Sequence, residues 1–183
     1  MHTKIVPGVL KYDGSQLSSL WAFRNYDLQG DSIVAFIGPC EVREHLVDLE
    51  DVKADAFIYS ENMLHFIIEH FEMDLEKTIY RQRLFISIIA EELREQGLNP
   101  VRSGDDIFIN NAKLSVSIAT LSPVSTLIHT GLNITGKGAP VKAIGLGEVG
   151  IASPEKFAEK IIARYVDEVA DIRMARCKVR GVF

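Results

Sequence analysis

The sequence predicts an α+β domain in which a largely antiparallel sheet is covered by helices. Short apolar runs separated by Gly, Asn, Asp and Pro turns are typical of strands, whereas two long segments repeat apolar residues about every 3.6 positions, as helices do. Of the 183 residues, 47% are hydrophobic and 25% are charged, which suffices for a proper hydrophobic core. We therefore expect one domain over residues 1–183.

The first sixty residues predict several short elements. Asp13-Gly14 should form a turn, and Gly38-Pro39 should end a buried strand. In chain order we expect a strand over 5–12, a helix over 15–24, a strand over 32–37, a helical segment over 42–53 and a strand over 56–59.

The middle of the chain predicts two helices. Ser60 is a suitable N-cap for a helix over 61–71, where apolar residues recur at helical spacing. A longer helix should begin at Asp74 and end near Gln96, with Gly97 in the left-handed position that follows it. The apolar stretch LFISIIA in its middle predicts burial against the sheet.

Strands and a final helix are expected in the C-terminal half. Residues 101–121 predict two strands around an Asn110-Asn111 turn, and residues 126–134 predict a third. Ser153-Pro154 is a strong start for a helix that reaches about Ile172, because proline is favoured at the first helical position. A basic tail follows it.

Composition excludes several classes of protein. The net charge of −5 and the lack of a long basic tract argue against double-stranded nucleic acid as the main partner. The apolar runs are too short for a bilayer span and no signal peptide is recognisable, so we expect a cytoplasmic protein without a membrane partner. Cys40 and Cys177 lie far apart and form no C-x-x-C pair, which excludes a zinc ribbon and a redox motif.

Two motifs look functional, but we interpret both as structural. Residues 145–150 (GLGEVG) match the dinucleotide pattern, yet the following helix has its own start at Ser153-Pro154, which favours a plain glycine-rich turn. His65 and His70 have one residue too many between them for the inverted zinc signature, and we expect both at the surface or its boundary. We assign no metal ligands from the sequence.

The best candidate for chemistry is Lys113, which begins a strand of apolar and small residues near Asp105-Asp106. Its ammonium could stabilise a substrate carboxylate or phosphate, although a lysine at a strand edge can also simply discourage aggregation. Arg81, Arg83 and the turn at Arg102-Ser103-Gly104 are candidate phosphate contacts, because guanidinium groups bind such anions bidentately. The two helical arginines fit equally well as solvated flanks of a buried segment.

Residues 60–134 resemble the catalytic core shared by biotin and lipoate protein ligases, which is related to class II aminoacyl-tRNA synthetases. The residues that carry the resemblance are RLFISIIAEELREQG, VRSGDDIFINNAKLSVSIA and IHTGLNI. By position, Asp106 and Lys113 stand where the ligases have their acid and catalytic lysine. Ser60 with Asn62, and Gly131 with Asn133, match flanking ligase motifs. The whole chain is identified as a member of a small uncharacterised archaeal family, domain of unknown function 366.

The resemblance implies binding of a small carboxylic acid, a nucleotide, or both, with Lys113 as electrophilic clamp and Asp106 orienting it or a metal. An adenylation or acyl transfer would use ATP and Mg²⁺, and an acceptor protein and a homodimer would fit the same picture. The chain departs from the ligases at three places, and the first of them, the missing loop, favours the alternative, a non-catalytic ligand-binding or complex-forming relative. Only residues 72–74 fill the place where we expect the ligases' glycine- and arginine-rich loop, Asp105 replaces an Asn, and Val116 replaces a Gly.

Overall fold

The computed structural model describes residues 1–54 and 57–182, leaving aside the side chain of Asp51, and these residues form eight strands and four helices. The strands are β1 (His2–Val9), β2 (Ser32–Val42), β3 (Ile58–His70), β4 (Val101–Ser103), β5 (Asp106–Ile109), β6 (Ala112–Lys113), β7 (Ser115–Leu121) and β8 (Thr126–Asn133). The helices are α1 (Trp21–Tyr26), α2 (Leu49–Lys53), α3 (Leu75–Glu95) and α4 (Pro154–Ala175).

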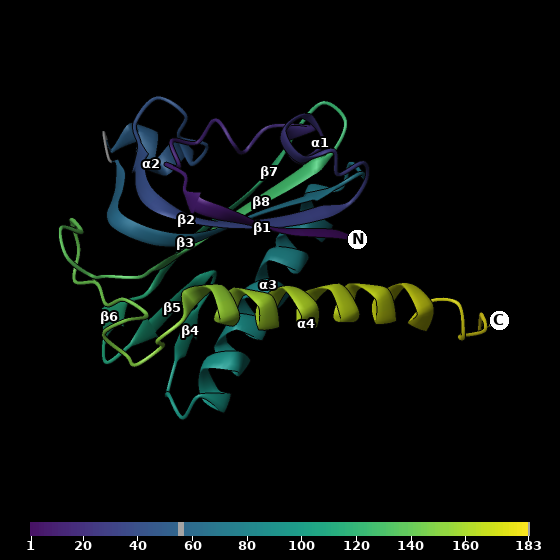
Figure 1. Cartoon of the computed structure of the whole chain (residues 1–183). Coiled ribbons are helices and arrows are strands. Elements are labelled where there is room, and N and C mark those ends of the chain that lie inside the picture. The colour runs from purple at the N-terminus through teal and green to yellow at the C-terminus, as the bar shows by residue number, and fades with distance from the viewer. Residues whose placement is uncertain (55–56, 183) are drawn as a thin grey trace.

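Five strands form one sheet in the order β1-β2-β3-β8-β7, and β4, β5 and β6 form a second, smaller sheet. Only the β1–β2 pair is parallel, while the other strand pairs are antiparallel. Helices α3 and α4 lie on one face of the large sheet, and α1 and α2 lie on the other (Figure 1). The α+β class with a largely antiparallel, helix-covered sheet is therefore confirmed.

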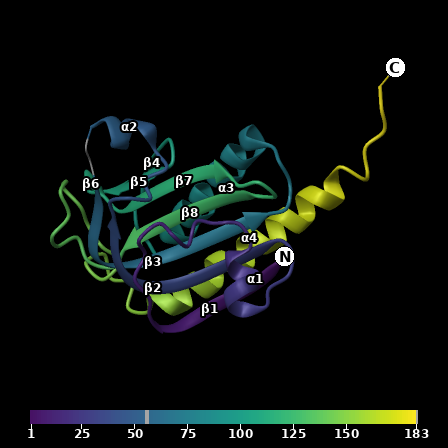
Figure 2. The same cartoon turned by 90° about the horizontal axis from the view of Figure 1, so that it is seen from above.

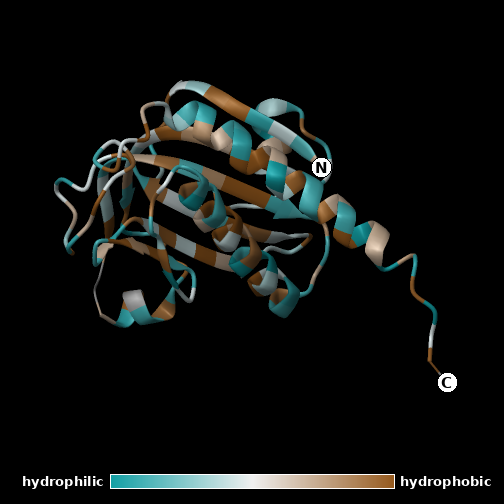
Figure 3. Ribbon diagram, turned by 90° about the horizontal axis from the view of Figure 1, so that it is seen from below, coloured by the Kyte–Doolittle hydropathy of each residue, from teal (hydrophilic) through white to brown (hydrophobic). Residues whose placement is uncertain are grey.

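Both long helices have the predicted starts. The Asp74 side chain accepts a hydrogen bond from Lys77 N, and Ser153 accepts one from Lys156 N. Gly97 follows α3 with a φ of +82°, as predicted for the left-handed position. Figure 3 shows hydrophobic strands behind the two helices, whose own residues alternate between hydrophilic and hydrophobic. For both helices the amphipathic repeat and the N-cap residue indicate the same helical segment, which is why the sequence predicts these helices well.

The predicted helix over 61–71 is wrong, because this segment belongs to β3 and runs through the centre of the sheet. It pairs with β2 on one side and with β8 on the other. From Met63 to His70 every residue is buried, because other parts of the chain cover both faces of the strand. A strand buried on both faces loses the alternation of apolar and polar residues, and its apolar run then imitates a helix. Ser60 is accordingly no N-cap.

The predictions for the N-terminal third are only partly correct. β2 continues through Gly38-Pro39 as far as Val42, with a register shift between Gly38 and Cys40 where a strand end was expected. The first strand lies earlier than predicted, at His2–Val9. Helix α1 begins at Trp21 instead of Ser15, and the segment over 42–53 is helical only in its last five residues. Ala56, at the start of the predicted strand over 56–59, lies outside the described residues.

The two faces of the large sheet have separate hydrophobic clusters. Even-numbered residues of β3, such as Leu64, Phe66 and Ile68, pack with α3 and α4. Odd-numbered residues, such as Met63 and Ile67, pack with the N-terminal segments. Seen from above, α4 runs obliquely behind the sheet, and its end with the following tail extends beyond the sheet (Figure 2). No described helix has an apolar stretch long enough to span a bilayer.

Candidate functional site

A cavity of about 540 Å³ opens on the face of the large sheet that is turned away from α3 and α4. Residues of β3, β7 and β8 contribute to its lining, together with Tyr12, Leu17, Val42 and residues 45–48. Residues 139–143 and the β5–β6 hairpin complete the rim. Apolar side chains, including Met63 and Val116, line much of this space. A cavity of this size with a few polar groups is typical of small-molecule sites.

Lys113 and Asp106 form an ion pair in the lining of the cavity. Lys113 Nζ lies 2.8 Å from Asp106 Oδ2, and the two side chains are 30% and 28% exposed. The β5–β6 hairpin brings them together, because Asn110 and Asn111 both take the left-handed backbone that a two-residue turn requires. An ammonium group has three N–H donors and Asp106 occupies one, so two remain for a ligand.

The backbone of Lys113 is held from two sides. Its N–H donates to Lys142 O at 2.9 Å, and its carbonyl accepts from Ile144 N at 3.0 Å. Asn133 also donates from Nδ2 to Lys113 O, at 3.3 Å, and Asn133 itself lines the cavity. The predicted ligand contact Asn133 therefore lies beside Lys113 and helps to position it.

Asp105 links the hairpin to α3. Arg83 Nη1 donates to Asp105 Oδ1 at 2.9 Å, and Gln82 Nε2 donates to Asp105 Oδ2 at 3.0 Å. Burial raises the pKa of the Asp105 carboxyl, against the opposing effect of Arg83. Asp105 contributes to the cavity lining, so its partner Arg83 lies close to the cavity. The Arg83 guanidinium is, however, already paired with the Asp105 carboxylate.

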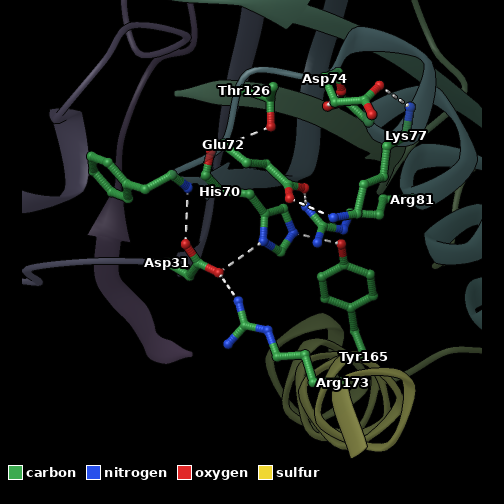
Figure 4. A network of polar contacts seen from close by, with 11 residues as sticks. Asp31, His70, Glu72, Asp74, Lys77, Arg81, Thr126, Tyr165 and Arg173 are labelled. Atoms are coloured by element: carbon green, nitrogen blue, oxygen red, sulfur yellow. Dashed lines mark hydrogen bonds and ion pairs between the residues drawn. The ribbon is translucent and has the colours of Figure 1, made fainter. Parts of the chain in front are cut away.

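Arg81 lies in a different place, in a polar network on the helix side of the sheet (Figure 4). Its guanidinium pairs with Glu72, and the side chain is 13% exposed. Nearby, His70 Nδ1 lies 3.2 Å from Asp31 Oδ2 and His70 Nε2 lies 2.9 Å from Tyr165 Oη. The structure does not bring Arg81 together with Lys113 at the cavity.

The other predicted ligand contacts are divided. In the β4–β5 turn, Arg102 Nη1 donates to Gly104 O at 2.7 Å, and Arg102, Ser103 and Gly104 are exposed outside the cavity lining. Asn62 is also outside the lining, and its carbonyl accepts from Ile134 N at 2.9 Å. Gly131 lies directly against Met63, a residue of the cavity lining: a Cβ at position 131 would come within 2.7 Å of Met63 Cε.

Sequence reasoning missed the rings of Tyr12 and His129, which line the cavity, and the His65 ring, which lies behind His129. His65 and His129 are 0% and 2% exposed, and Tyr12 stacks on His129 with a centroid distance of 3.8 Å and an interplanar angle of 14°. Burial lowers the pKa of His65 to about 3 and lowers that of His129 well below its usual value. The expectation of surface histidines is wrong. A strand assignment for β3 would have revealed His65, because Met63, His65 and Ile67 then share one face.

Residues 71–74 connect β3 to α3. Because the preceding element is β3, which ends at His70, residues 72–74 do not join two helices and are no place to expect a ligand-covering loop. The connection between β2 and β3 runs from residue 43 to residue 57, and its His45, Leu46, Val47, Asp48 and Phe57 line the cavity. Described residues of this connection therefore lie beside the cavity, whereas the loop was expected at residues 72–74.

The structure also bears on the metal and dinucleotide sites. The described part of the chain contains no group of three or more His, Cys, Asp or Glu side chains that could hold a metal ion. Residues 145–150 form a turn in which Gly145 lies close to the backbone just after β8, since a Cβ there would lie 2.3 Å from Ile134 O. Glu148 Oε2 accepts from Gly136 N at 3.0 Å, so this motif is a structural turn, as expected.

Comparison with solved structures places this fold among known ones. A protein of unknown function from Pyrococcus horikoshi matches with a TM-score of 0.95 and 42% identity, over 100% of this chain and 99% of that one. Biotin protein ligase from Aquifex aeolicus matches with a TM-score of 0.62 and 12% identity, over 95% and 71%. Lipoate-protein ligase A bound with ATP matches with a TM-score of 0.57 and 16% identity, over 93% and 86%. The ligases share the fold of this chain.

Sequence comparison gives the family. An uncharacterised protein of Methanocaldococcus jannaschii is 41% identical over 170 residues, which cover 89% of this chain and 77% of the relative. A family model described as Domain of unknown function (DUF366) matches residues 1–180. The chain therefore belongs to this DUF366 family, whose fold is that of the biotin and lipoate protein ligases.

Proposed function

We propose that this protein binds a small carboxylic acid in the cavity, with the carboxylate at Lys113 and the body of the acid along the apolar lining. The observation that carries the proposal is the Lys113–Asp106 pair at the edge of a cavity of about 540 Å³. Asp106 holds the ammonium in place and leaves it two free donors, and a charge-assisted hydrogen bond to a carboxylate is among the stronger polar contacts.

The apolar part of the cavity supports a ligand with a hydrocarbon body. Val42, Leu46, Met63, Val116 and Ile118 all contribute to the lining. Burial of apolar surface stabilises a complex by roughly 25 cal/mol per Å² before the costs of association. A small acid that fits lengthwise would combine this gain with one anchored charge.

Adenylation of the acid is the reaction that the fold and Lys113 favour. A carboxylate oxygen would attack the α-phosphorus of ATP, the bond to the pyrophosphate oxygen would break, and an acyl adenylate and pyrophosphate would result. Lys113 would offset the negative charge that builds up on the phosphoryl oxygens. Mg²⁺ would enter with the nucleotide and neutralise the departing pyrophosphate, and an acceptor protein would be the expected recipient of the acyl group.

One observation favours the alternative, a ligand-binding relative without catalysis. Arg81 and Arg83, which could have held the phosphates, are paired with Glu72 and Asp105. A triphosphate would have to displace these carboxylates, which a carboxylic acid alone need not do.

A thermal-shift screen tests the binding proposal, with biotin, lipoate, octanoate, amino acids, ATP, and ATP with Mg²⁺ as ligands. A ligand at a hundred times its Kd stabilises the folded state by about 2.7 kcal/mol, which is a shift of several degrees for a chain of this size. Lys113→Ala should bind the effective acid roughly ten- to a hundredfold more weakly, because it loses a charge-assisted hydrogen bond.

Lys137→Ala, at an exposed position of the neighbouring loop, is the matched control and should bind like the wild type. Equal binding by wild type and Lys113→Ala would contradict the proposal. Exchange of labelled pyrophosphate into ATP in the presence of the acid then separates adenylation from binding alone.

A further inference from the structure

The two buried histidines under the cavity have defined tautomers. His65 Nε2 lies 3.2 Å from Gly38 O, and a carbonyl oxygen only accepts, so His65 carries its proton on Nε2. His65 Nδ1 lies 3.1 Å from His129 Nε2. Because burial keeps both rings neutral, His65 Nδ1 accepts and His129 Nε2–H donates. His129 Nδ1 is therefore a bare acceptor.

Two polar atoms at this place lack a protein partner. Within the described residues, neither His129 Nδ1 nor Tyr12 Oη makes a hydrogen bond. Neither atom is fully enclosed, because among the described residues Ser32 Oγ is the one unpaired side-chain polar atom that is shut off from solvent. The atoms of His129 and Tyr12 are thus not sealed inside the protein. Both residues line the cavity, which is the open space that these atoms reach.

The pair is also rigidly placed. The Tyr12 and His129 rings stack at 3.8 Å, and the His65 ring lies 5.1 Å from the Tyr12 ring. The backbone of Tyr12 is anchored to β2 through Tyr12 N to Pro39 O and Glu41 N to Tyr12 O, both at 2.9 Å. Fixed donors and acceptors of this kind give a cavity its specificity, because a ligand that does not satisfy them leaves polar atoms unpaired.

We propose that Tyr12 and His129 recognise a neutral hydrogen-bonding group at the end of the acid remote from its carboxylate. This inference rests on the proposed function and names its substrate class. His129 Nδ1 takes an N–H or O–H donor, and the Tyr12 hydroxyl can donate or accept. An acid with an amide or hydroxyl end would pair with both atoms, whereas a plain fatty acid would bury them without a partner. A charged end would lose its hydration beside these buried rings, which supply no opposite charge.

The test compares matched ligands that differ in one hydroxyl group. Hexanoic, octanoic and decanoic acids and their ω-hydroxy counterparts are titrated into wild type, Tyr12→Phe and Tyr26→Phe by calorimetry. Wild type should bind the fitting ω-hydroxy acid roughly tenfold more tightly than the plain acid of equal length. Tyr12→Phe should lose most of this preference, and Tyr26→Phe, whose ring is outside the cavity lining, should keep it.

A second readout needs no variant. The ¹⁵N signals of the His129 ring should show the Nε2–H tautomer in the free protein, and the Nδ1 signal should move when the ω-hydroxy acid binds but not when the plain acid binds. Equal affinities for both series, with Lys113 still required, overturn this inference and leave the proposed function standing. A preference for the ω-hydroxy acids that is lost in Tyr12→Phe, with affinities unaffected by Lys113→Ala, would overturn the carboxylate proposal while supporting recognition at Tyr12. Absence of binding by every compound overturns both.

Discussion

The two faces of the large sheet contain buried histidines in contrasting surroundings. On the helix face, His70 lies between Asp31 and Tyr165, at 3.2 and 2.9 Å, so both ring nitrogens have protein partners. On the cavity face, His129 has one nitrogen bonded to His65 and the other open to the cavity. A buried polar group with complete partners stabilises the fold, and one with a missing partner is available for binding.

Asp31, His70 and Tyr165 have the order of an acid, a base and a hydroxyl that is typical of an activated nucleophile. Tyr165 is nevertheless 0% exposed and is absent from the cavity lining, so a substrate does not reach it. We interpret the arrangement as the attachment of α4 to the sheet, reinforced by Arg173, which also pairs with Asp31 (Figure 4).

The largest expected effect that tests this contrast is pH-dependent stability. Burial lowers the pKa of His65, His70 and His129 from the usual value of 6.5. Below that value the unfolded chain binds protons that the folded chain does not, so the free energy of unfolding falls as the pH drops. Each histidine contributes up to about 1.4 kcal/mol per pH unit between roughly pH 6.5 and its folded pKa. Denaturant unfolding at several pH values measures the slope.

The contrast predicts an order among the three rings. Asp31 favours the charged form of His70, whereas the cavity-face rings have no carboxylate among the causes of their shifts. In an NMR titration His70 should therefore protonate at a higher pH than His65 and His129. A free energy of unfolding that stays constant from about pH 7 to about pH 5 would refute the account.

A smaller effect is expected for Asp31→Ala. The substitution removes the partner of His70 Nδ1 and Arg173, and also the acceptor for Phe71 N at 2.9 Å. We expect a loss of about 2 kcal/mol in the free energy of unfolding, below the range for fully buried pairs, because the Arg173 side chain is 52% exposed. Glu41→Ala, which also removes a carboxylate with two cationic partners, should cost far less because it lies at the surface. Equal losses for the two variants would show that the network contributes little.

The smallest effect comes from the same chemical change made on each face. Tyr165→Phe leaves His70 Nε2 without its partner in the core and should cost about 1–2 kcal/mol of unfolding free energy. Tyr12→Phe removes a hydroxyl without a protein partner and should change stability by less than about 0.5 kcal/mol. Urea unfolding of the two variants provides the comparison. A larger loss for Tyr12→Phe would mean that its hydroxyl supports the fold and is not reserved for a ligand.

Much of the fold and the centre of the candidate site could be predicted from local signals. Helices α3 and α4 combine an amphipathic period with side-chain caps at Asp74 and Ser153. The Asn110-Asn111 turn fixes the hairpin that pairs Lys113 with Asp106. These features depend on residues close together in the chain, which sequence patterns record directly.

The remaining features depend on contacts between distant segments. β3 is a strand because β2 and β8 pair with it on both sides, and its apolar run contains no sign of those partners. Tyr12, His65 and His129 come from three separate segments and meet only when the sheet forms. Arg81 likewise pairs with Glu72 because of how α3 packs, and the position of Arg81 in the helix does not reveal this pairing.

The most direct test of the central claim is a crystal structure of the protein saturated with the acid that binds best. The account predicts that the acid occupies the cavity with its carboxylate within hydrogen-bond distance of Lys113 Nζ and its other end at Tyr12 and His129. An acid bound outside the cavity, or bound with its carboxylate away from Lys113, would contradict it.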